Sequence, residues 1–334
     1  MKVTCWLILL LIAAGLLSLA TGSVSIPPGS LLRLILGDNG WIAENATFTT
    51  ILVDLRLPHM LLMLLVGAAL GGSGAAYQGL FRNPLADPYL IGVASGAGLG
   101  AVLAMSIQLP YTTPGLMAVP LAAFSLGLGT VWLVYALARV GKVTPTTNLI
   151  LAGVAVSSFA SALTSLVMLR SQGELRRALG WLLGGGTLTG WQPVIAGLPY
   201  ILLGLSLLVS LGYRLDVMQF GDEQAEQLGI PVTRVRWLVV AGATLATAGA
   251  VAFSGIIGFV GLIVPHVFRL MGLSGYRKLL PASMLGGAIL LVLADIVARV
   301  ILAPQQLPVG IVTAMIGAPF FLWVLKRARS GAFW

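Results

Sequence analysis

The sequence is dominated by about ten uninterrupted apolar stretches, each long enough to cross a lipid bilayer as a helix. A crossing takes roughly 20 apolar residues, because the hydrocarbon core is about 30 Å thick and an α-helix rises about 1.5 Å per residue. Only 19 basic and 10 acidic side chains interrupt the 334 residues, and 58% of the chain is hydrophobic. A soluble domain of this composition would expose large apolar surfaces to water. The sequence therefore predicts an all-α, polytopic membrane protein with a single transmembrane domain over residues 1–334.

The apolar stretches place the expected spans near residues 4–22, 58–80, 90–109, 115–138, 148–168, 193–212, 237–253, 255–272, 281–303 and 309–326. The gap at Gly255–Gly258 is so short that the seventh and eighth spans could instead be one broken helix. The first stretch could instead be a cleaved signal peptide. Its length, and the lack of an A-x-A site after it, favour a retained first span.

The distribution of basic residues predicts the orientation, because cytoplasmic loops retain Lys and Arg. With the N-terminus inside, the inner side holds 13 of the 19 basic residues: Lys2, Arg82, Arg139, Lys142, Arg214, Arg234, Arg236, Arg269, Arg277, Lys278, Lys326, Arg327 and Arg329. The outer side holds Arg33, Arg56, Arg170, Arg176, Arg177 and Arg299. The net charge of +9 fits this topology and attraction to anionic lipid; no basic cluster is interleaved with aromatic residues, so nucleic acid is not an expected partner.

No motif for catalysis or metal binding occurs in the chain. The two histidines lie far apart, Cys5 is the single cysteine, and there is no H-E-x-x-H, G-x-S-x-G or phosphate-binding G-x-x-x-x-G-K-[ST] sequence. Asp295 is the only acid deep in a span. We therefore expect no catalytic residue, no metal site and no cofactor in this chain, which we interpret as a conduit whose energy is supplied elsewhere.

Several long segments resemble one family of membrane proteins. They include Phe81–Ala101 (FRNPLADPYLIGVASGAGLGA), Gly221–Arg236 (GDEQAEQLGIPVTRVR) and Leu307–Pro319 (LPVGIVTAMIGAP). Further segments are RLPHMLLMLLVGAAL, LILAGVAVSS, GFVGLIVPHVFRL and DIVARV, which begin at Arg56, Leu149, Gly258 and Asp295. From about residue 50 to the C-terminus the chain resembles the FecCD family, the permeases of ABC importers for ferric siderophores, haem and cobalamin.

The resemblance implies a bundle of about ten helices, as in the type II ABC importer permeases, that pairs with a second copy and leaves the translocation path between the two. It also implies two cytoplasmic ATPase subunits, which would bind ATP and Mg, and a substrate-binding protein at the outer face, periplasmic or lipid-anchored. The setting would be a bacterial or archaeal cytoplasmic membrane, with both termini in the cytoplasm.

The longest inner loop resembles the segment through which the ATPase moves the bundle in this family. The loop covers about residues 213–236, and the matching residues are Asp222, Glu223, Glu226, Leu228 and Gly229. A docking element should be helical, exposed to water and charged enough to stay out of the membrane. The alternative is an ordinary solvated loop.

The resemblance implies that Arg56, His59 and Arg299 meet carboxylates of the binding protein at the outer face. Such charge complementarity contributes mainly to association rate and specificity. His59 replaces the family's usual arginine, and because histidine titrates near physiological pH this contact could be weaker or pH-dependent. The alternative for Arg299 is an intrahelical pair with Asp295, four residues earlier, and both roles can hold together.

A short segment between the fourth and fifth spans matches the family's cytoplasmic gate. It consists of Thr144, Pro145, Thr146, Thr147 and Asn148. Small polar side chains suit a gate that must seal and then release a bulky chelate without binding it. The alternative is an ordinary helix cap, in which Thr147 or Asn148 bonds to free amides at the start of the fifth span.

The segment 174–186 resembles a short outer helix that lines the family's cavity. Arg176 and Arg177 on it would either meet anionic groups of the cargo or face lipid headgroups. For the cargo we expect a ferric siderophore or other iron chelate first, then cobalamin and haem. An ion-coupled secondary transporter would need ionisable residues near the midplane, where only Asp295 comes close, and an intramembrane enzyme would need a reactive cluster that the sequence lacks.

Overall fold

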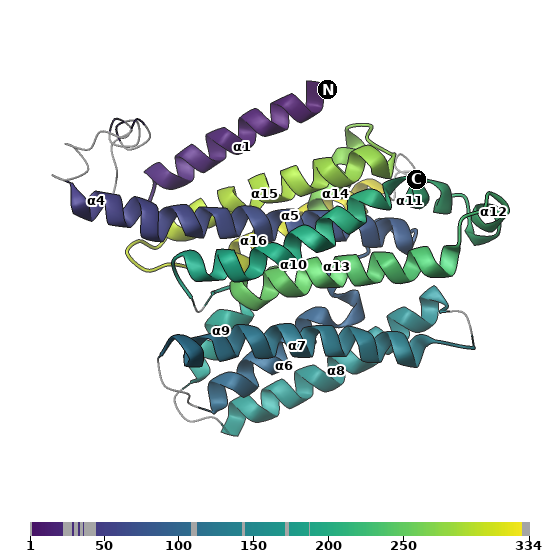
Figure 1. The fold of residues 1–334 in the computed structure, drawn as a ribbon, viewed down its shortest axis with the longest axis horizontal. Coiled ribbons are helices and arrows are strands. Elements are labelled where there is room, and N and C mark those ends of the chain that lie inside the picture. The colour runs from purple at the N-terminus through teal and green to yellow at the C-terminus, as the bar shows by residue number, and fades with distance from the viewer. Residues whose placement is uncertain are drawn as a thin grey trace.

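The computed structural model describes residues 2–22, 29, 33, 36, 45–107, 112–141, 144–170, 174–186 and 188–328, and within these ranges every regular element is helical (Figure 1). The longer helices are α1 Lys2–Ala20, α5 Leu57–Leu80, α6 Val93–Ser106, α7 Thr113–Ala138, α8 Thr146–Arg170, α10 Trp191–Ser210, α13 Val232–Ser254, α14 Val260–Leu270, α15 Tyr276–Val300 and α16 Val309–Ala328. The shorter ones are α4 Ala46–Thr50, the π-helix η1 Ile51–Arg56, the 3-10 helix η2 Pro88–Ile91, α9 Leu175–Leu182, α11 Gly212–Met218 and α12 Asp222–Gln227.

The expected ten-helix bundle is confirmed. Within the described ranges, six continuous helical stretches are long and apolar enough to cross a membrane: Ala46–Leu80, Pro114–Ala138, Thr146–Arg170, Trp191–Ser210, Val232–Ser254 and Tyr276–Val300. The other four apolar helices are shorter, at Thr4–Ala20, Val93–Ser106, Val260–Leu270 and Val309–Val324. Together they match the ten expected spans in order along the chain.

The seventh and eighth spans are two separate helices, α13 and α14. Gly255 ends α13 with a φ of 75°, and Phe259 precedes α14 with a φ of 70°, a backbone conformation that interrupts a right-handed helix. The expected eighth span over 255–272 therefore begins too early. The helix has 11 residues, and at about 1.5 Å per residue it covers only about half of a bilayer.

Helix α5 lies at the centre of the larger helix layer, packed against α15, α13, α10 and α14. Its backbone approaches its neighbours closely. A Cβ at Gly67 would collide with the carbonyl group of Gly287 in α15, and one at Gly74 would collide with the carbonyl group of Gly261 in α14. Small residues allow this approach, which lets helices associate where the hydrophobic effect between them is absent. The glycine-rich spans are thus explained by helix packing.

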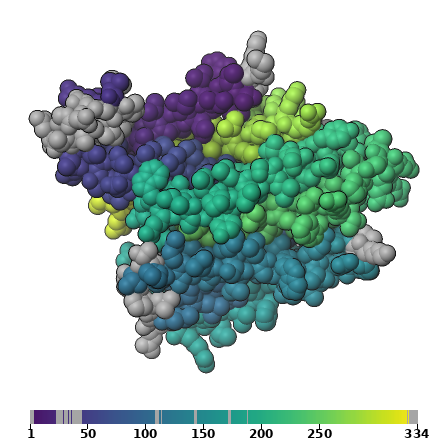
Figure 2. Space-filling model, in the orientation of Figure 1, coloured from purple at the N-terminus to yellow at the C-terminus, as the bar shows by residue number. Residues whose placement is uncertain are grey.

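Helices α6, α7 and α8 form a second layer that packs together and meets the larger layer mainly through α13 (Figure 1). Helix α1 lies at the margin of the bundle, against α15 (Figure 2). Large side chains on its free face, such as Trp6, Leu9 and Ile12, are more than half exposed. This is the surface expected of a helix that faces lipid on most of its circumference, and Cys5 is exposed on it.

The two ends of the bundle carry different elements. Figure 1 places α11, α12, the start of α1 and the end of α16 at one end, which we call the inner end, and α4 and α9 at the opposite, outer end. Two members of the predicted inner basic set, Lys142 and Arg329, lie outside the described residues.

Candidate functional site

The predicted coupling segment, about residues 213–236, protrudes at the inner end as two short helices, α11 and α12, and continues into the start of α13 (Figure 1). Below, the name refers to α11 and α12. Gly221 joins them with a φ of 117°, which favours glycine. Ala225 is the buried side of α12, whereas Glu223 and Glu226 are exposed. Two apolar side chains, Phe220 at 75% and Leu228 at 68%, are also exposed. The protruding segment thus presents both charged and apolar side chains to its surroundings.

The first anchor of the coupling segment is Asp216 in α11. Its carboxylate accepts the backbone N–H groups of Tyr276 and Arg277, at the start of α15. Free N–H groups at a helix start attract a carboxylate because they carry partial positive charge. The segment is therefore held to the inner end of α15.

The second anchor is Asp222, the first residue of α12. Its Oδ2 atom accepts a hydrogen bond from Arg236 at 2.8 Å, and its Oδ1 atom lies 3.4 Å from the Arg82 guanidinium, just after α5. The Asp222 side chain is 40% exposed, whereas that of Arg236 is only 5% exposed. One carboxylate thus joins the coupling segment to α13 and to the end of the central helix.

Arg236 also reaches the predicted gate. Its second terminal nitrogen donates to the backbone carbonyl of Thr144 at 3.0 Å, and Thr144 is 2% exposed. Sequence analysis counted Arg236 only as an inner-side charge and so missed this link. The spacing contained a signal: Arg236 lies four residues from both Val232 and Val240, which places it on the apolar, buried face of α13.

The gate segment leads directly into α8. That helix begins at Thr146, so Thr147 and Asn148 lie in its first turn. The alternative expectation that one of these two residues caps the helix from outside is therefore wrong. Thr147 is exposed and Thr144 is buried, so the segment runs from the interior to the surface.

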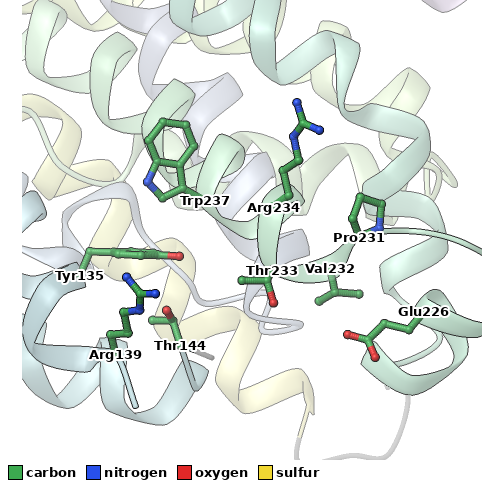
Figure 3. A pocket seen from close by; sticks show the side chains of 9 residues that line it. All are labelled: Tyr135, Arg139, Thr144, Glu226, Pro231, Val232, Thr233, Arg234 and Trp237. Carbon is green, nitrogen blue, oxygen red and sulfur yellow. The ribbon is translucent and has the colours of Figure 1, made fainter. Parts of the chain in front are cut away.

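A cavity of about 530 Å³ separates the gate from most of the coupling segment (Figure 3). Tyr135 and Arg139, from the end of α7, line one side of it, and Trp237 in α13 lines another. The Glu226 carboxylate points across the cavity toward Val232 (Figure 3). Part of the space between Thr144 and Glu226 of α12 is thus not filled by side chains.

At the outer end, a buried carboxylate lies between two basic side chains. Asp295 has a side chain 3% exposed; its Oδ1 atom is 2.8 Å from His59 Nε2 and its Oδ2 atom is 2.9 Å from Arg299 Nε. The alternative expectation of an intrahelical pair between Asp295 and Arg299 is confirmed. His59 is the accessible member of this outer cluster, with 40% of its side chain exposed.

Arg299 also holds the end of α1. Its terminal nitrogens donate to Ser18 Oγ at 2.7 Å and to the Thr21 carbonyl at 3.0 Å. Arg56 donates to the Leu19 carbonyl at 2.7 Å. The last carbonyl groups of a helix have no partner within the helix and carry partial negative charge, so two arginines stabilise them. Arg299 is buried by these contacts and is not presented on the outer surface, whereas Arg56 and His59 are half-buried.

Two further cavities adjoin the outer cluster. Arg56, His59 and Leu188 line one of about 290 Å³, and His59, Arg177 and Trp181 line another of about 480 Å³. The expected short outer helix is present as α9. Its Arg177 lies 3.6 Å from Glu174 and lines the larger cavity, while Arg176 is exposed and lines neither.

Comparison with known proteins relates the whole chain to one family. A model of the FecCD transport family matches residues 10–327. The Fe(3+) dicitrate transport system permease protein FecD of Escherichia coli (strain K12) is 40% identical over 98% of this chain and 100% of FecD. The cobalamin import system permease protein BtuC of Halobacterium salinarum is 46% identical over 84% of this chain and 74% of BtuC. A structure described as an inward-facing conformation of a metal-chelate type ABC transporter is similar with a TM-score of 0.83 and 33% identity, over 97% of this chain and 98% of the other.

Proposed function

The chain belongs to the FecCD transport family of ABC transporter permeases, and from this premise we propose that it carries a metal chelate into the cytoplasm as the membrane-spanning subunit of an ATP-driven importer. The observation that carries the proposal is the inner end. There an exposed, partly apolar segment is tied through Asp222 and Arg236 to the predicted gate. Two ATPase subunits, which bind ATP and Mg, would dock on Asp222, Glu223, Glu226, Leu228 and Gly229.

The surface of α8 supports pairing with a second copy. Of the six long spans, α8 is the least buried, with 17% of its most apolar window inside the chain. Ser158, Ser161 and Ser165 recur on an exposed face, and the Ser158 and Ser165 hydroxyls donate to carbonyls of their own helix. A face of small hydroxyl groups with satisfied hydrogen bonds suits a path that binds its cargo weakly. In the proposed dimer this face lines the path between the copies.

The outer end supports docking of a substrate-binding protein. Arg56 and His59 line an open cavity there, and Arg299 lies behind them at its wall. Acidic side chains on the partner would complement this positive region. Arg56→Glu is expected to weaken docking, most strongly at low salt, because exposed charges are screened as ionic strength rises. Titration of the binding protein at two salt concentrations measures this, and unchanged affinity at both would contradict the docking role.

For the cargo, the proposal places a ferric siderophore or another iron chelate first. Similarity to FecD, whose name gives Fe(3+) dicitrate, supports an iron chelate. Similarity to the archaeal BtuC supports cobalamin as the second candidate, and haem is a third of the same class. Uptake of each chelate by vesicles that contain the complete importer, with ATP inside, distinguishes the candidates. Uptake of none of them would contradict the substrate class.

The proposal uses alternating access by a shift between two states. ATP binding brings the ATPases together, the coupling segments move, and the paired bundles exchange inward and outward openings. A ligand can drive such a shift only if it binds the two states with different affinity. In this proposal ATP and the docked binding protein are the ligands that do so. The start of α1 and the end of α16 lie at the same end as α12, and we propose that both termini are in the cytoplasm of a bacterial or archaeal cell.

Ion-coupled secondary transport is the competing mechanism. It requires an ionisable group that can take up and release the coupling ion near the midplane. Asp295, the expected candidate, lies at the outer end of the bundle and not near the midplane, and it is paired there with His59 and Arg299. Vesicles that contain this chain alone, with a sodium or proton gradient and no ATPase, test the alternative. Accumulation of the chelate under these conditions would overturn the proposed function.

A further inference from the structure

We infer that Arg236 is the positioning residue through which movement of the coupling segment reaches the cytoplasmic gate. This inference rests on the proposed function, and it adds the residue that transmits the movement. Arg236 is the one side chain in the described residues that bonds to both segments, at Asp222 and at the Thr144 carbonyl. The two partners are 14 and 92 residues away from it in sequence.

The guanidinium group suits this task because of its shape. It is planar and rigid, and its terminal nitrogens donate in fixed directions. In Arg236 one terminal nitrogen bonds to the carboxylate and the other to the carbonyl, so a shift of either partner displaces a single rigid group. A lysine ammonium has the same charge, but as a single point on a flexible stem it does not fix the relative positions of two acceptors.

Burial makes the contact at the gate costly to lose. Thr144 and the Arg236 side chain are 2% and 5% exposed, so water does not readily replace either partner. A buried carbonyl left without a donor loses its full solvation, whereas an exposed one regains it from water. The coupling segment therefore cannot carry Arg236 away unless the gate also rearranges.

The other contact of Arg236 is with Asp222 on the coupling segment. Asp222 is 40% exposed and has a second basic partner in Arg82 at 3.4 Å. When an ATPase subunit moves α12, the longer contact with Arg82, which is exposed on both sides, is lost at low cost, whereas the 2.8 Å contact with the buried Arg236 is retained and displaces that side chain. The cavity between the coupling segment and the gate gives α12 the space for this movement.

The test compares Arg236→Lys and Arg236→Met in the complete importer. Both are made with Cys5→Ser and with Leu151→Cys, a reporter on α8 that is 63% exposed. The measurement is the rate of thiol labelling at position 151 with and without ATP, together with ATP hydrolysis. We expect the unaltered arginine to give two different rates. We expect both variants to hydrolyse ATP while the ratio of the rates falls toward one.

Arg277→Met is the matched control, because Arg277 is an exposed arginine at the same end whose bond to Asp216 is made by its backbone N–H, which the substitution leaves in place. If Arg236→Met weakens the fold, Arg236→Lys still provides the test, because it keeps the buried positive charge and removes only the planar guanidinium group. If both Arg236 variants kept the wild-type ratio of labelling rates with and without ATP, the inference would be overturned and the proposed function would stand. The absence of any ATP-dependent change with Arg236 intact would overturn the proposed function as well. Loss of the change in Arg277→Met too would show a general effect of inner-end charge and would also contradict the inference.

Discussion

The inner and outer ends each contain an acid bonded to two basic side chains, but the two acids differ in burial. Asp295 is 3% exposed and lies between helices α5 and α15. Asp222 is 40% exposed and lies at the start of a short helix that protrudes from the bundle. A buried charge needs its partners for the fold to persist, whereas an exposed one can lose them at little cost. The outer cluster therefore belongs to the structure of the bundle, and the inner cluster can be part of its movement.

The arginines of the two clusters are alike in burial, and their second contacts explain the difference in role. Arg299 bonds to the end of α1, a marginal helix that packs mainly on the same helix as Arg299 itself. Arg236 bonds to Thr144, in the connection between α7 and α8. The first contact fixes one helix to its neighbour. The second joins the two helix layers at the point where a gate is predicted.

Asp295→Ala should give the largest loss of stability. It leaves the buried Arg299 without its carboxylate, and removal of one partner of a buried ion pair costs about 3–5 kcal/mol. The free energy of unfolding in detergent, measured with the permease alone, provides the value. A loss below about 1 kcal/mol would mean that the buried outer cluster contributes no more to stability than an exposed ion pair does, which would contradict the difference proposed between the two ends.

Arg299→Met should have the next largest effect, with a local consequence at α1. The substitution removes the hydrogen bonds from Arg299 to the end of α1, but it leaves Asp295 with a basic partner in His59, so the loss should be smaller than that of Asp295→Ala. Hydrogen exchange should rise in α1 more than in α5. Equal protection of α1 in both proteins would show that packing against α15 holds the helix without Arg299.

The architecture of the bundle could be predicted from the sequence because apolar length determines it. Crossing a bilayer requires long apolar helices, and their number and order follow from counting. The predictions that the structure corrects concern the exact ends of individual helices. The span expected at 58–80 continues a helix that already starts at Ala46 and passes through the π-helix η1, and the span expected at 90–109 is shortened to Val93–Ser106. The turn between α13 and α14 contains no charged residue that would mark it in the sequence. The start of the eighth span was therefore predicted at residue 255, whereas α14 begins at Val260.

The candidate sites were predicted as separate segments, and their connections were not. The pair of Asp295 and Arg299 follows from a spacing of four residues on a helix. The contact of Arg299 with Ser18 and that of Arg236 with Thr144 join residues 281 and 92 positions apart. Contacts of this kind depend on how helices pack, which local spacing does not determine.

Asp222→Asn should lower stability less than Asp295→Ala does. The Asp222 side chain is 40% exposed, and its pair with Arg82 is exposed on both sides, so that pair contributes only about 0–1 kcal/mol. The amide still accepts a hydrogen bond from Arg236, but its attraction to Arg82 is lost. We expect a clear drop in the stimulation of ATP hydrolysis by the binding protein. Wild-type stimulation at a wild-type unfolding free energy would show that the Asp222 charge has no part in coupling.

Leu228→Glu should have the smallest effect on stability and still abolish coupling. Leu228 is 68% exposed, and surface substitutions away from special contacts usually change stability by less than about 0.5 kcal/mol. A carboxylate at this position would oppose burial against an ATPase subunit, because an unpaired charge is costly to desolvate. Binding of the ATPase and ATP-dependent uptake measure the effect. Leu302→Glu, an exposed leucine near the outer end, is the control and should bind the ATPase normally. If the Leu228→Glu variant bound the ATPase and transported the chelate as well as this control, the exposed apolar side chains of the coupling segment would not be the docking surface. The inner end would then differ from the outer end in burial but not in function.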